Sequence, residues 1–294
     1  MKKIVVFTDF SERAAHASEY AHQLGRELQA NIILYHAYLN PASQPYAAQV
    51  AWPVENFAAL ELTSRKELEL AASKLSNMSA TSPGFSFNPK IQTRCEEGEI
   101  TDNLEALLSD RDIVLFVLAN HRKGFSSLIT GNHMKKLLEQ SRIPVLVVPQ
   151  AAQFKGLHKF AFATDLQHHD LEVLHSLSSM ARHGDASIML AHVSSEKEQE
   201  QSKEKRDQVQ QFLCAVSSKI NYPHIYYRYV QDAQVSSGLK WVSEHVSFDL
   251  LVMVHHQKNF FGRLFSSSHT HEVADNLNIP LLVYPYPATN YPVF

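Results

Sequence analysis

Polar side chains that could contact a ligand stand directly after short apolar runs at several points in the sequence. Thr8 and Asp9 follow Ile4–Phe7, and His36 follows Ile32–Tyr35. A hydroxyl, a carboxylate and an imidazole at such points can hydrogen-bond a small molecule, and a neutral imidazole can also bind zinc. Ligands bind parallel α/β sheets beyond the carboxyl ends of their strands. The spacing therefore predicts a ligand-binding edge at these residues.

The apolar runs predict the strands that would position these side chains. Runs without polar alternation are typical of strands buried on both faces, which occur mainly in parallel sheets covered by helices. The runs are Ile4–Phe7, Ile32–Tyr35, Ile113–Leu118 and Val145–Val148, with a weaker, alternating run at Ile91–Cys95. Helical patterns separate them: one follows an N-cap at Ser11 and continues through Leu28, and the others cover Phe57–Met78, Glu99–Leu108 and His133–Gln140. Alternating strands and helices predict an α/β fold with a doubly wound parallel sheet.

The same pattern occurs twice in the chain. Four pairs of segments match in the same order: Lys3–Asp9 with Lys159–Asp165, Asn31–Ala37 with Ser187–Val193, Asp112–Val117 with Asp249–Val254, and Ile143–Val148 with Ile279–Tyr284. The offset is 156 residues at Asp9 and at His36, but only 136 residues at Pro144. The second copy has therefore lost about 20 residues, which we place in the part that corresponds to Tyr38–Glu55.

The repeat predicts two five-stranded domains, residues 1–150 and residues 159–285, joined by the linker Gln150–His158. In the second copy Thr164, Asp165 and His192 take the places of Thr8, Asp9 and His36. Its strands are expected near 160–164, 187–193, 224–230, 249–254 and 280–284, and its helices near 169–183, 197–219, 234–246 and 267–277.

The composition limits the kinds of partner. Hydrophobic residues make up 45% and charged residues 19% of the 294 positions, as in ordinary globular proteins, and the net charge is −3 with histidine neutral. This charge gives no broad electrostatic reason to expect nucleic acid or a membrane as a partner. No segment approaches the roughly 18 apolar residues of a membrane span. Cys95 and Cys214 have no zinc-binding spacing, so we expect a cytoplasmic protein with buried free thiols.

Three segments of the first copy resemble the universal stress protein family. They are Phe7–Glu12 (FTDFSE), the strand Ile32–Ala37 with its terminal His and small apolar residue, and Ile143–Pro149. The resemblance covers nearly the whole chain, twice, and is that of a tandem member. It implies strand order 3-2-1-4-5 in each domain and pairing of the two fifth strands, which gives an internal pseudo-dimer in a tandem chain. A protein partner and a further homodimer stay open.

ATP-binding members of this family carry the motif G-x2-G-x9-G-(S/T) after the fourth strand, and this chain keeps only part of it. Glycines let the backbone approach the phosphates, which the N-terminus of the following helix attracts. In the first copy Ala119 stands at the first glycine position, Arg122 at the second, and Gly131 lies one residue early. Asn132 replaces Ser/Thr and can still cap a helix. The second copy, from His255 on, has no glycine at a motif position, so we expect no nucleotide there.

The resemblance therefore implies a site for ATP or another adenine nucleotide in the first domain. Its predicted residues are Thr8, Asp9, Ala37, Ala119, His121, Arg122, Gly131 and Asn132. Asp9 would contact the ribose or base, and the structural alternative is that Asp9 caps the strand-to-helix turn. Arg122 could equally fill the site, as His255 and His256 could in the second copy. The chain would then be a regulatory or protein-interaction module without a nucleotide.

The histidines are numerous, but their spacing identifies no catalytic or metal site. Of the 17, those near predicted strand ends form two groups: His36, His121 and His133 in the first copy, and His168, His169, His192, His255, His256, His269 and His271 in the second. No spacing such as HExxH occurs, so we assign no metal ligands and keep a pH-sensitive cluster as the alternative. Nothing nominates a general base. We therefore assign no catalytic residue and expect, at most, the slow ATP hydrolysis of some family members.

Overall fold

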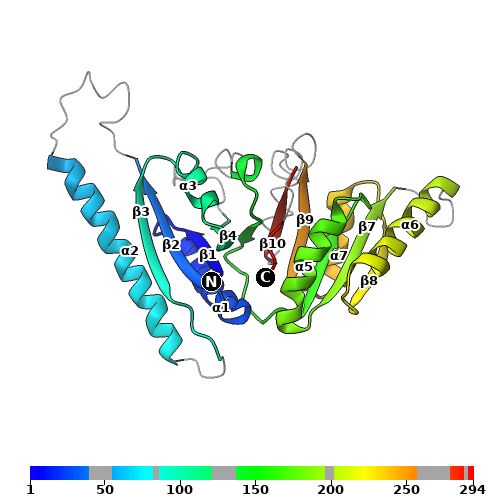
Figure 1. Ribbon diagram of the computed structural model, residues 1–294, viewed down its shortest axis with the longest axis horizontal. Helices are drawn as coiled ribbons and strands as arrows, with labels where there is room; N and C mark the ends of the chain where they lie inside the picture. The colour runs from blue at the N-terminus through cyan, green and yellow to red at the C-terminus, as the bar shows by residue number, and fades with distance from the viewer. Residues whose placement is uncertain (40–54, 82–85, 121–136, 196–201, 257–278, 288–290) are drawn as a thin grey trace, which may run out of the picture. The chain divides into compact units, whose positions relative to one another are not determined.

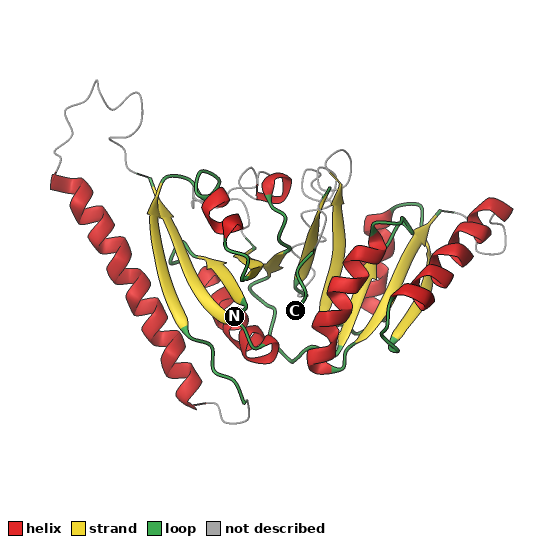
Figure 2. Ribbon diagram, viewed as in Figure 1, coloured by secondary structure: helices red, strands yellow, loops and turns green. Residues whose placement is uncertain are grey.

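The computed structural model describes residues 1–39, 55–81, 86–120, 137–195, 202–256, 279–287 and 291–294. Within them the chain forms two compact units, Met1–Ser141 and Arg142–Phe294. Each unit combines a mostly parallel sheet with helices that contact its strands (Figures 1 and 2). The α/β class predicted from the sequence is confirmed.

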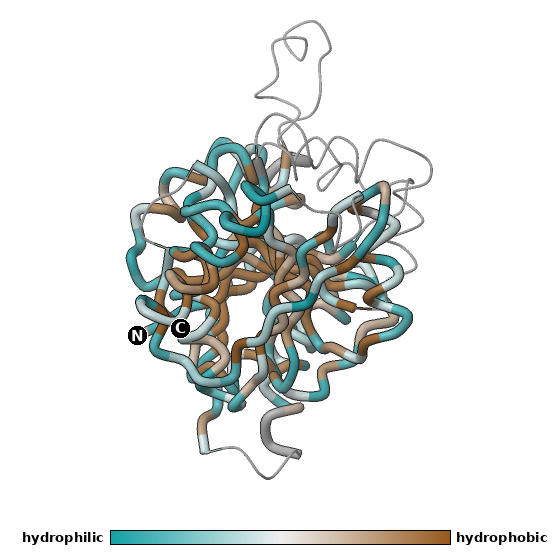
Figure 3. Tube along the Cα trace, turned by 90° about the vertical axis from the view of Figure 1, so that its right-hand side faces the viewer, coloured by the Kyte–Doolittle hydropathy of each residue, from teal (hydrophilic) through white to brown (hydrophobic). Residues whose placement is uncertain are grey.

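The first unit is built around parallel strands. They are β1 (Lys3–Phe7), β2 (Asn31–Tyr38), β3 (Ile91–Glu97) and β4 (Ile113–Ala119), in the spatial order β3-β2-β1-β4. The helices are α1 (Glu12–Leu28), α2 (Glu55–Thr81) and α3 (Leu104–Ser109). All of β4 is buried, and the ring of Phe7 lies 5.4 Å from the rings of Tyr35 and Phe116. Figure 3 shows hydrophobic residues gathered toward the interior of the fold and hydrophilic residues toward its outside, as buried apolar runs predict.

Helix α1 begins at the predicted position because Ser11 caps it. The backbone of Ser11 is extended, and its hydroxyl accepts a hydrogen bond from the amide of Ala14 at 3.2 Å. This bond satisfies one of the amides that the first turn of a helix leaves without a backbone partner. Glu12 in the first turn and Arg26 in the last turn both complement the helix dipole.

The second unit repeats this arrangement. Its strands are β5 (Val145–Val148), β6 (Lys159–Ala163), β7 (Ser187–Ser194), β8 (Ile225–Gln231), β9 (Leu250–His256) and β10 (Leu281–Tyr286). Its helices are α5 (Asp170–Gly184), α6 (Lys203–Lys219) and α7 (Val235–His245). The spatial order is β5-β10-β9-β6-β7-β8, and all neighbours are parallel except β10 and β5.

Strand β5 comes from the first repeat but belongs to the second compact unit. The first unit shows the 3-2-1-4 part of the predicted order, and the second repeat shows all of it, since β8-β7-β6-β9-β10 corresponds to 3-2-1-4-5. Within the second unit β5 pairs antiparallel with β10, with Leu146 opposite Leu282. The division between the compact units therefore falls after Ser141, before the last strand of the first repeat.

The predicted helix over Glu99–Leu108 is wrong in its first half, because α3 begins only at Leu104. Gly98 has a φ of 105°, which ends the strand in a conformation that favours glycine. A turn follows, in which Asp102 Oδ2 accepts a hydrogen bond from the Glu99 amide at 3.0 Å. The side-chain amide of Asn103 donates to the Glu97 carbonyl at 2.9 Å. These local side-chain bonds compete with helix formation.

The residues missing from the second copy come partly from a helix. Helix α2 has 27 residues, whereas its counterpart α6 has 17. The prediction that placed the whole loss in the segment matching Tyr38–Glu55 is therefore wrong in part. Of the predicted helix 133–140, residues 137–140 are helical and the rest lies outside the described residues, as does the predicted helix 267–277.

The chain end folds back onto α5 within the second unit. The Ser176 hydroxyl donates to the Pro292 carbonyl at 2.5 Å, and the Phe294 amide donates to Ser179 Oγ at 2.8 Å. The Tyr291 hydroxyl donates to the Pro285 carbonyl at 2.6 Å. These bonds hold the segment after β10 close to the helix that follows β6.

Two further features concern membrane-spanning helices and the cysteines. Among the described residues, no helix combines the length and apolar character needed to cross a membrane. Both cysteines are free, as predicted, but Cys95 is half-buried and Cys214 is exposed, so the prediction of buried thiols is wrong. Cys214 lies on α6, whose buried residues are Phe212 and Val216.

Candidate functional site

The carboxyl ends of β1, β2 and β4 bring several predicted site residues to one edge of the first unit. The Thr8 amide donates to the Tyr35 carbonyl at 2.9 Å, which continues the β1–β2 ladder by one residue. The neighbouring residue, His36, lies with Nδ1 2.8 Å from the Thr8 carbonyl oxygen. On the other side of β1, the register pairs Val6 with Val117, so Ala119 ends β4 beside Thr8. The sheet itself therefore sets the positions of these residues.

The side chains of Thr8 and Asp9 hold a tight turn, Thr8–Ser11, which we call the first-unit turn. Thr8 Oγ1 accepts a hydrogen bond from the Phe10 amide at 3.1 Å. Asp9 Oδ1 accepts one from the Ser11 amide at 3.1 Å and one from the Ser11 hydroxyl at 2.6 Å. These bonds stabilise Phe10 at a φ of 64°, a left-handed conformation that side chains adopt rarely. Asp9 therefore stabilises this turn through Oδ1, and its contact with the ribose or base of a nucleotide stays a prediction.

His36 is buried beside this turn and favours the neutral form. Burial lowers its pKa, and its hydrogen bond with the Thr8 carbonyl opposes this shift. In a neutral ring whose Nδ1–H donates to Thr8, the other nitrogen is an acceptor. The ring of Phe10 packs against His36 at 4.3 Å between centroids, which fixes the imidazole plane.

The predicted site residues divide into two sets. Thr8, Asp9, Ala37 and Ala119 lie at the carboxyl edge of the first unit, with Ala37 and Ala119 buried. His121, Arg122, Gly131 and Asn132 lie outside the described residues. His133, His269 and His271 lie outside them as well. The structure therefore describes the predicted site residues at the strand ends, but not those of the segment after β4.

The second unit has the same backbone turn at Thr164–Gln167, which we call the second-unit turn. The Thr164 amide donates to the Ala191 carbonyl at 3.1 Å, and Leu166 has a φ of 63°. Thr164 Oγ1 accepts a hydrogen bond from the Leu166 amide at 2.9 Å, as Thr8 does from Phe10. His192 Nδ1 lies 3.3 Å from the Thr164 carbonyl oxygen. The two repeats thus build one turn geometry.

A buried carboxylate distinguishes the second-unit turn. The Thr164 hydroxyl donates to Asp170 Oδ2 at 2.5 Å, and the Gln167 amide also donates to this oxygen, at 3.4 Å. Asp170 is only 1% exposed and occupies the position that Ala14 has in the first unit. Burial raises the pKa of Asp170 to about 7; the bond from Thr164 opposes this shift, and the Asp165 carboxylate adds to it.

Sequence reasoning missed Asp170. The available signal was an acidic residue at the start of an apolar helix pattern, which usually indicates a dipole-complementing surface residue. Only the fold shows that this carboxylate is buried against Thr164.

His169 lies against the same carboxylate. Its Nε2 is 3.4 Å from Asp170 Oδ1, and its ring packs on Tyr286 with 4.5 Å between centroids. Asp165, His169 and Asp170 each offer a ligand atom, and these atoms all lie within 4.8 Å of one another. In the first unit the position of His169 is taken by Arg13.

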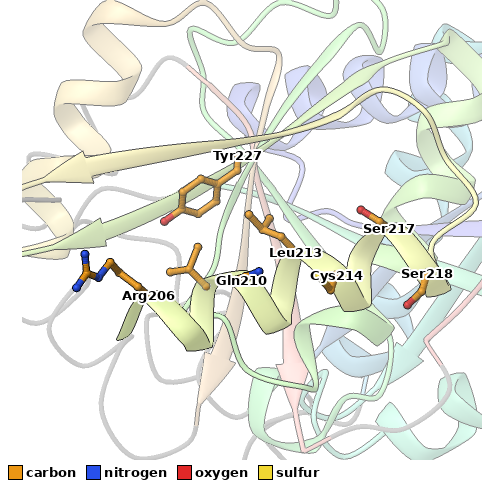
Figure 4. Close-up of a pocket in the computed structure, with 8 residues that line it drawn as sticks. Arg206, Gln210, Leu213, Cys214, Ser217, Ser218 and Tyr227 are labelled. Atoms are coloured by element: carbon orange, nitrogen blue, oxygen red, sulfur yellow. The ribbon is translucent and has the colours of Figure 1, made fainter. Parts of the chain in front are cut away.

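A separate groove runs along α6 in the second unit (Figure 4). It has a volume of about 650 Å³, and its described lining residues all belong to α6 and β8. Leu213, Cys214 and Tyr227 are among its lining residues, and Arg206 lies at one end. It shares no described lining residue with either turn.

Comparison with known proteins identifies the family. The model of the universal stress protein family matches residues 1–149 and again residues 156–285. The chain belongs to the universal stress protein family. Its two matches make it a tandem member, as the resemblance implied, and no curated protein matches the sequence.

Several solved structures resemble this chain at low sequence identity, to different degrees. One from Archaeoglobus fulgidus DSM 4304 is 11% identical, has a TM-score of 0.63, and is matched over 96% of this chain and 95% of that one. A functionally unknown protein from Pseudomonas aeruginosa PAO1 is 12% identical, with a TM-score of 0.51 and coverage of 96% and 92%. A universal stress protein in complex with cAMP matches 46% of this chain and 98% of that one, at 15% identity and a TM-score of 0.34.

Proposed function

We propose that the protein is a stress-response ligand-binding protein whose first unit binds ATP or a related adenine nucleotide. The observation that carries this proposal is the preformed first-unit turn. It holds Asp9 at the carboxyl edge of the sheet, where ligands of parallel α/β sheets bind, beside the buried His36. A turn already fixed by hydrogen bonds loses little conformational freedom when a ligand binds.

Charge favours the first unit over the second for an anionic ligand. At the two matching positions of the helix start, the first unit has Arg13 and Ala14, whereas the second has His169 and the buried Asp170. Two carboxylates at the second-unit turn repel phosphate groups, since like charges interact strongly at short range in a partly buried setting. The second unit would therefore act as a structural partner in nucleotide binding.

The proposed activity is binding, with at most slow ATP hydrolysis. Asp9 accepts two hydrogen bonds from Ser11, and the Nδ1 atom of His36 is occupied by the Thr8 carbonyl. Both groups are thus used to build the turn, which does not favour a role as general base. We therefore propose no general base, and we propose that the carboxyl edge of the first unit positions a bound ligand.

The proposal includes an internal pseudo-dimer in the cytoplasm. Strand β5 ends the first repeat and β10 ends the second, so their antiparallel pairing supports association of the repeats through their last strands. A further homodimer or a protein partner would add to this arrangement.

The experiment is calorimetry and thermal shift with millimolar ATP, ADP and AMP, using wild type, Asp9→Asn and Asp165→Asn. Asparagine keeps an oxygen that accepts from Ser11, so the Asp9 variant retains its turn. It lacks the second carboxylate oxygen, which would accept a charge-assisted hydrogen bond from a ribose hydroxyl or the base. We expect it to bind nucleotide at least about 10-fold more weakly, and we expect the matched Asp165 variant to bind like wild type.

Two results would reject the proposal. One is no heat and no thermal shift with any of the three nucleotides. The other is equal loss of binding in the Asp9 and Asp165 variants. Mass spectrometry of small molecules released from freshly purified, denatured protein gives an independent reading. A chain with neither released nor added nucleotide bound would be a regulatory or protein-interaction module.

A further inference from the structure

Three metal-ligating side chains converge at the second-unit turn, outside the proposed nucleotide site. Asp165 follows β6, and His169 and Asp170 stand at the start of α5. Their ligand atoms lie within 4.8 Å of one another, and His169 Nε2 is 3.4 Å from Asp170 Oδ1. An ion with tetrahedral bonds of about 2.0–2.1 Å holds its ligand atoms about 3.4 Å apart. The His169–Asp170 spacing already matches this value.

Surrounding residues orient two of these side chains. The Thr164 hydroxyl and the Gln167 amide donate to Asp170 Oδ2, which leaves Oδ1 on the side of His169. Tyr286 packs against the His169 ring and fixes its plane. Hydrogen bonds to the far oxygen of a ligating carboxylate and packing of a ligating ring are typical supports of a metal site. Asp165 is exposed and can adjust its position to complete the set.

The donor set points to one class of ion. One imidazole nitrogen and two carboxylate oxygens suit a divalent first-row transition ion, since imidazole binds zinc and its neighbours better than magnesium or calcium. Three protein ligands with one position left to water is a common zinc arrangement. A cation would also offset the repulsion between the Asp165 and Asp170 carboxylates.

We propose that Asp165, His169 and Asp170 bind one divalent transition-metal ion, with Zn²⁺ the preferred ion, at the carboxyl edge of the second unit. The matching first-unit positions are Asp9, Arg13 and Ala14, so the first unit lacks two of the three ligands. The site is therefore specific to the second unit, and it does not depend on the proposed nucleotide binding.

The test measures Zn²⁺ binding to the full chain without an affinity tag, because tag histidines would bind the ion. The protein is stripped with a chelator, dialysed, and titrated with Zn²⁺ against a metal-binding dye, without nucleotide. His169→Gln and Asp165→Asn remove one ligand each, and His168→Gln is the control, since exposed His168 adjoins the site and is not a proposed ligand. Near-ultraviolet circular dichroism checks that each variant is folded.

We expect one tight site per wild-type chain, at least about 10-fold weaker binding in His169→Gln and Asp165→Asn, and unchanged binding in His168→Gln. Co²⁺ bound to the wild type should show the visible absorption of a four- or five-coordinate ion, and this signal should vanish in His169→Gln. Wild-type binding that persists in the folded His169→Gln variant would overturn the proposal. The absence of a tight site, or equally tight Mg²⁺ binding, would overturn it as well.

Discussion

The first-unit turn and the second-unit turn have the same backbone conformation but different side-chain contacts. In both, a threonine hydroxyl accepts from the amide two residues on, and the residue between strand and helix has a φ near 64° (64° at Phe10 and 63° at Leu166). In the first, Asp9 accepts a hydrogen bond from the Ser11 hydroxyl, and Ser11 caps α1. In the second, Thr164 turns its hydroxyl hydrogen toward the buried Asp170. The difference shows that a few residues at a helix start can change the side-chain contacts of a duplicated turn while the sheet stays the same.

The largest expected difference concerns the threonines. Thr164→Val removes a donor to a buried carboxylate and an acceptor for Leu166, so it should reduce the free energy of unfolding by about 2–3 kcal/mol. Thr8→Val removes only the acceptor for Phe10 and should cost about 1 kcal/mol. Urea denaturation of both variants at pH 7 measures the two losses. Equal losses would mean that the Thr164–Asp170 bond does not distinguish the turns.

The pH dependence of stability tests the buried carboxylate. The pKa of Asp170 is raised to about 7 in the folded chain, against about 3.9 in an unfolded one. Between these values the folded chain binds more protons than the unfolded chain, so the free energy of unfolding decreases as the pH rises from about 4 to about 7. Asp170→Asn removes this slope and should be more stable than the metal-free wild type at pH 8, by on the order of 2 kcal/mol.

The control for this prediction is Asp9→Asn, whose carboxylate is not buried to the same degree. Urea denaturation at a series of pH values, with chelator present, gives the difference between each variant and wild type. If the Asp170 difference is constant from pH 4 to pH 8, this carboxylate ionises normally and the account of the second-unit turn fails.

The smallest expected difference concerns the helix caps. Ser11→Ala removes the cap of α1 and should cost about 1 kcal/mol. Gln167 occupies the matching position before α5, and its side chain does not cap that helix, so Gln167→Ala should change stability by less than about 0.5 kcal/mol. Thermal unfolding followed by circular dichroism would compare the two variants. A larger loss of stability in Gln167→Ala than in Ser11→Ala would show that Gln167, not Ser11, is the residue that caps its helix.

The sheet could be predicted from the sequence because burial on both faces produces continuous apolar runs. Ile4–Phe7 and Val145–Val148 are examples, and both are strands within a residue of the predicted bounds. Ser11 was also predictable, since a cap acts through its own local backbone. The start of α3 was not, because the turn of Asp102 and Asn103 depends on side-chain bonds that compete with the helix.

The candidate site divides in the same way. Thr8 and Asp9 were predictable because polar residues after buried strands must lie at the carboxyl edge of the sheet. Asp170 was not predictable, because its burial depends on the contact with Thr164 and on the packing around α5. The sequence pattern singled out histidines. The group that distinguishes the second-unit turn, however, is the Asp170 carboxylate beside His169.

The central claim is that the two turns bind different ligands, and separate titrations of two variants test it most directly. Wild type, Asp9→Asn and His169→Gln are each titrated with ATP and, in a separate experiment, with Zn²⁺. The account predicts that Asp9→Asn loses affinity for ATP and keeps that for Zn²⁺, while His169→Gln keeps affinity for ATP and loses that for Zn²⁺. It is contradicted if either variant loses both ligands or if neither variant loses any.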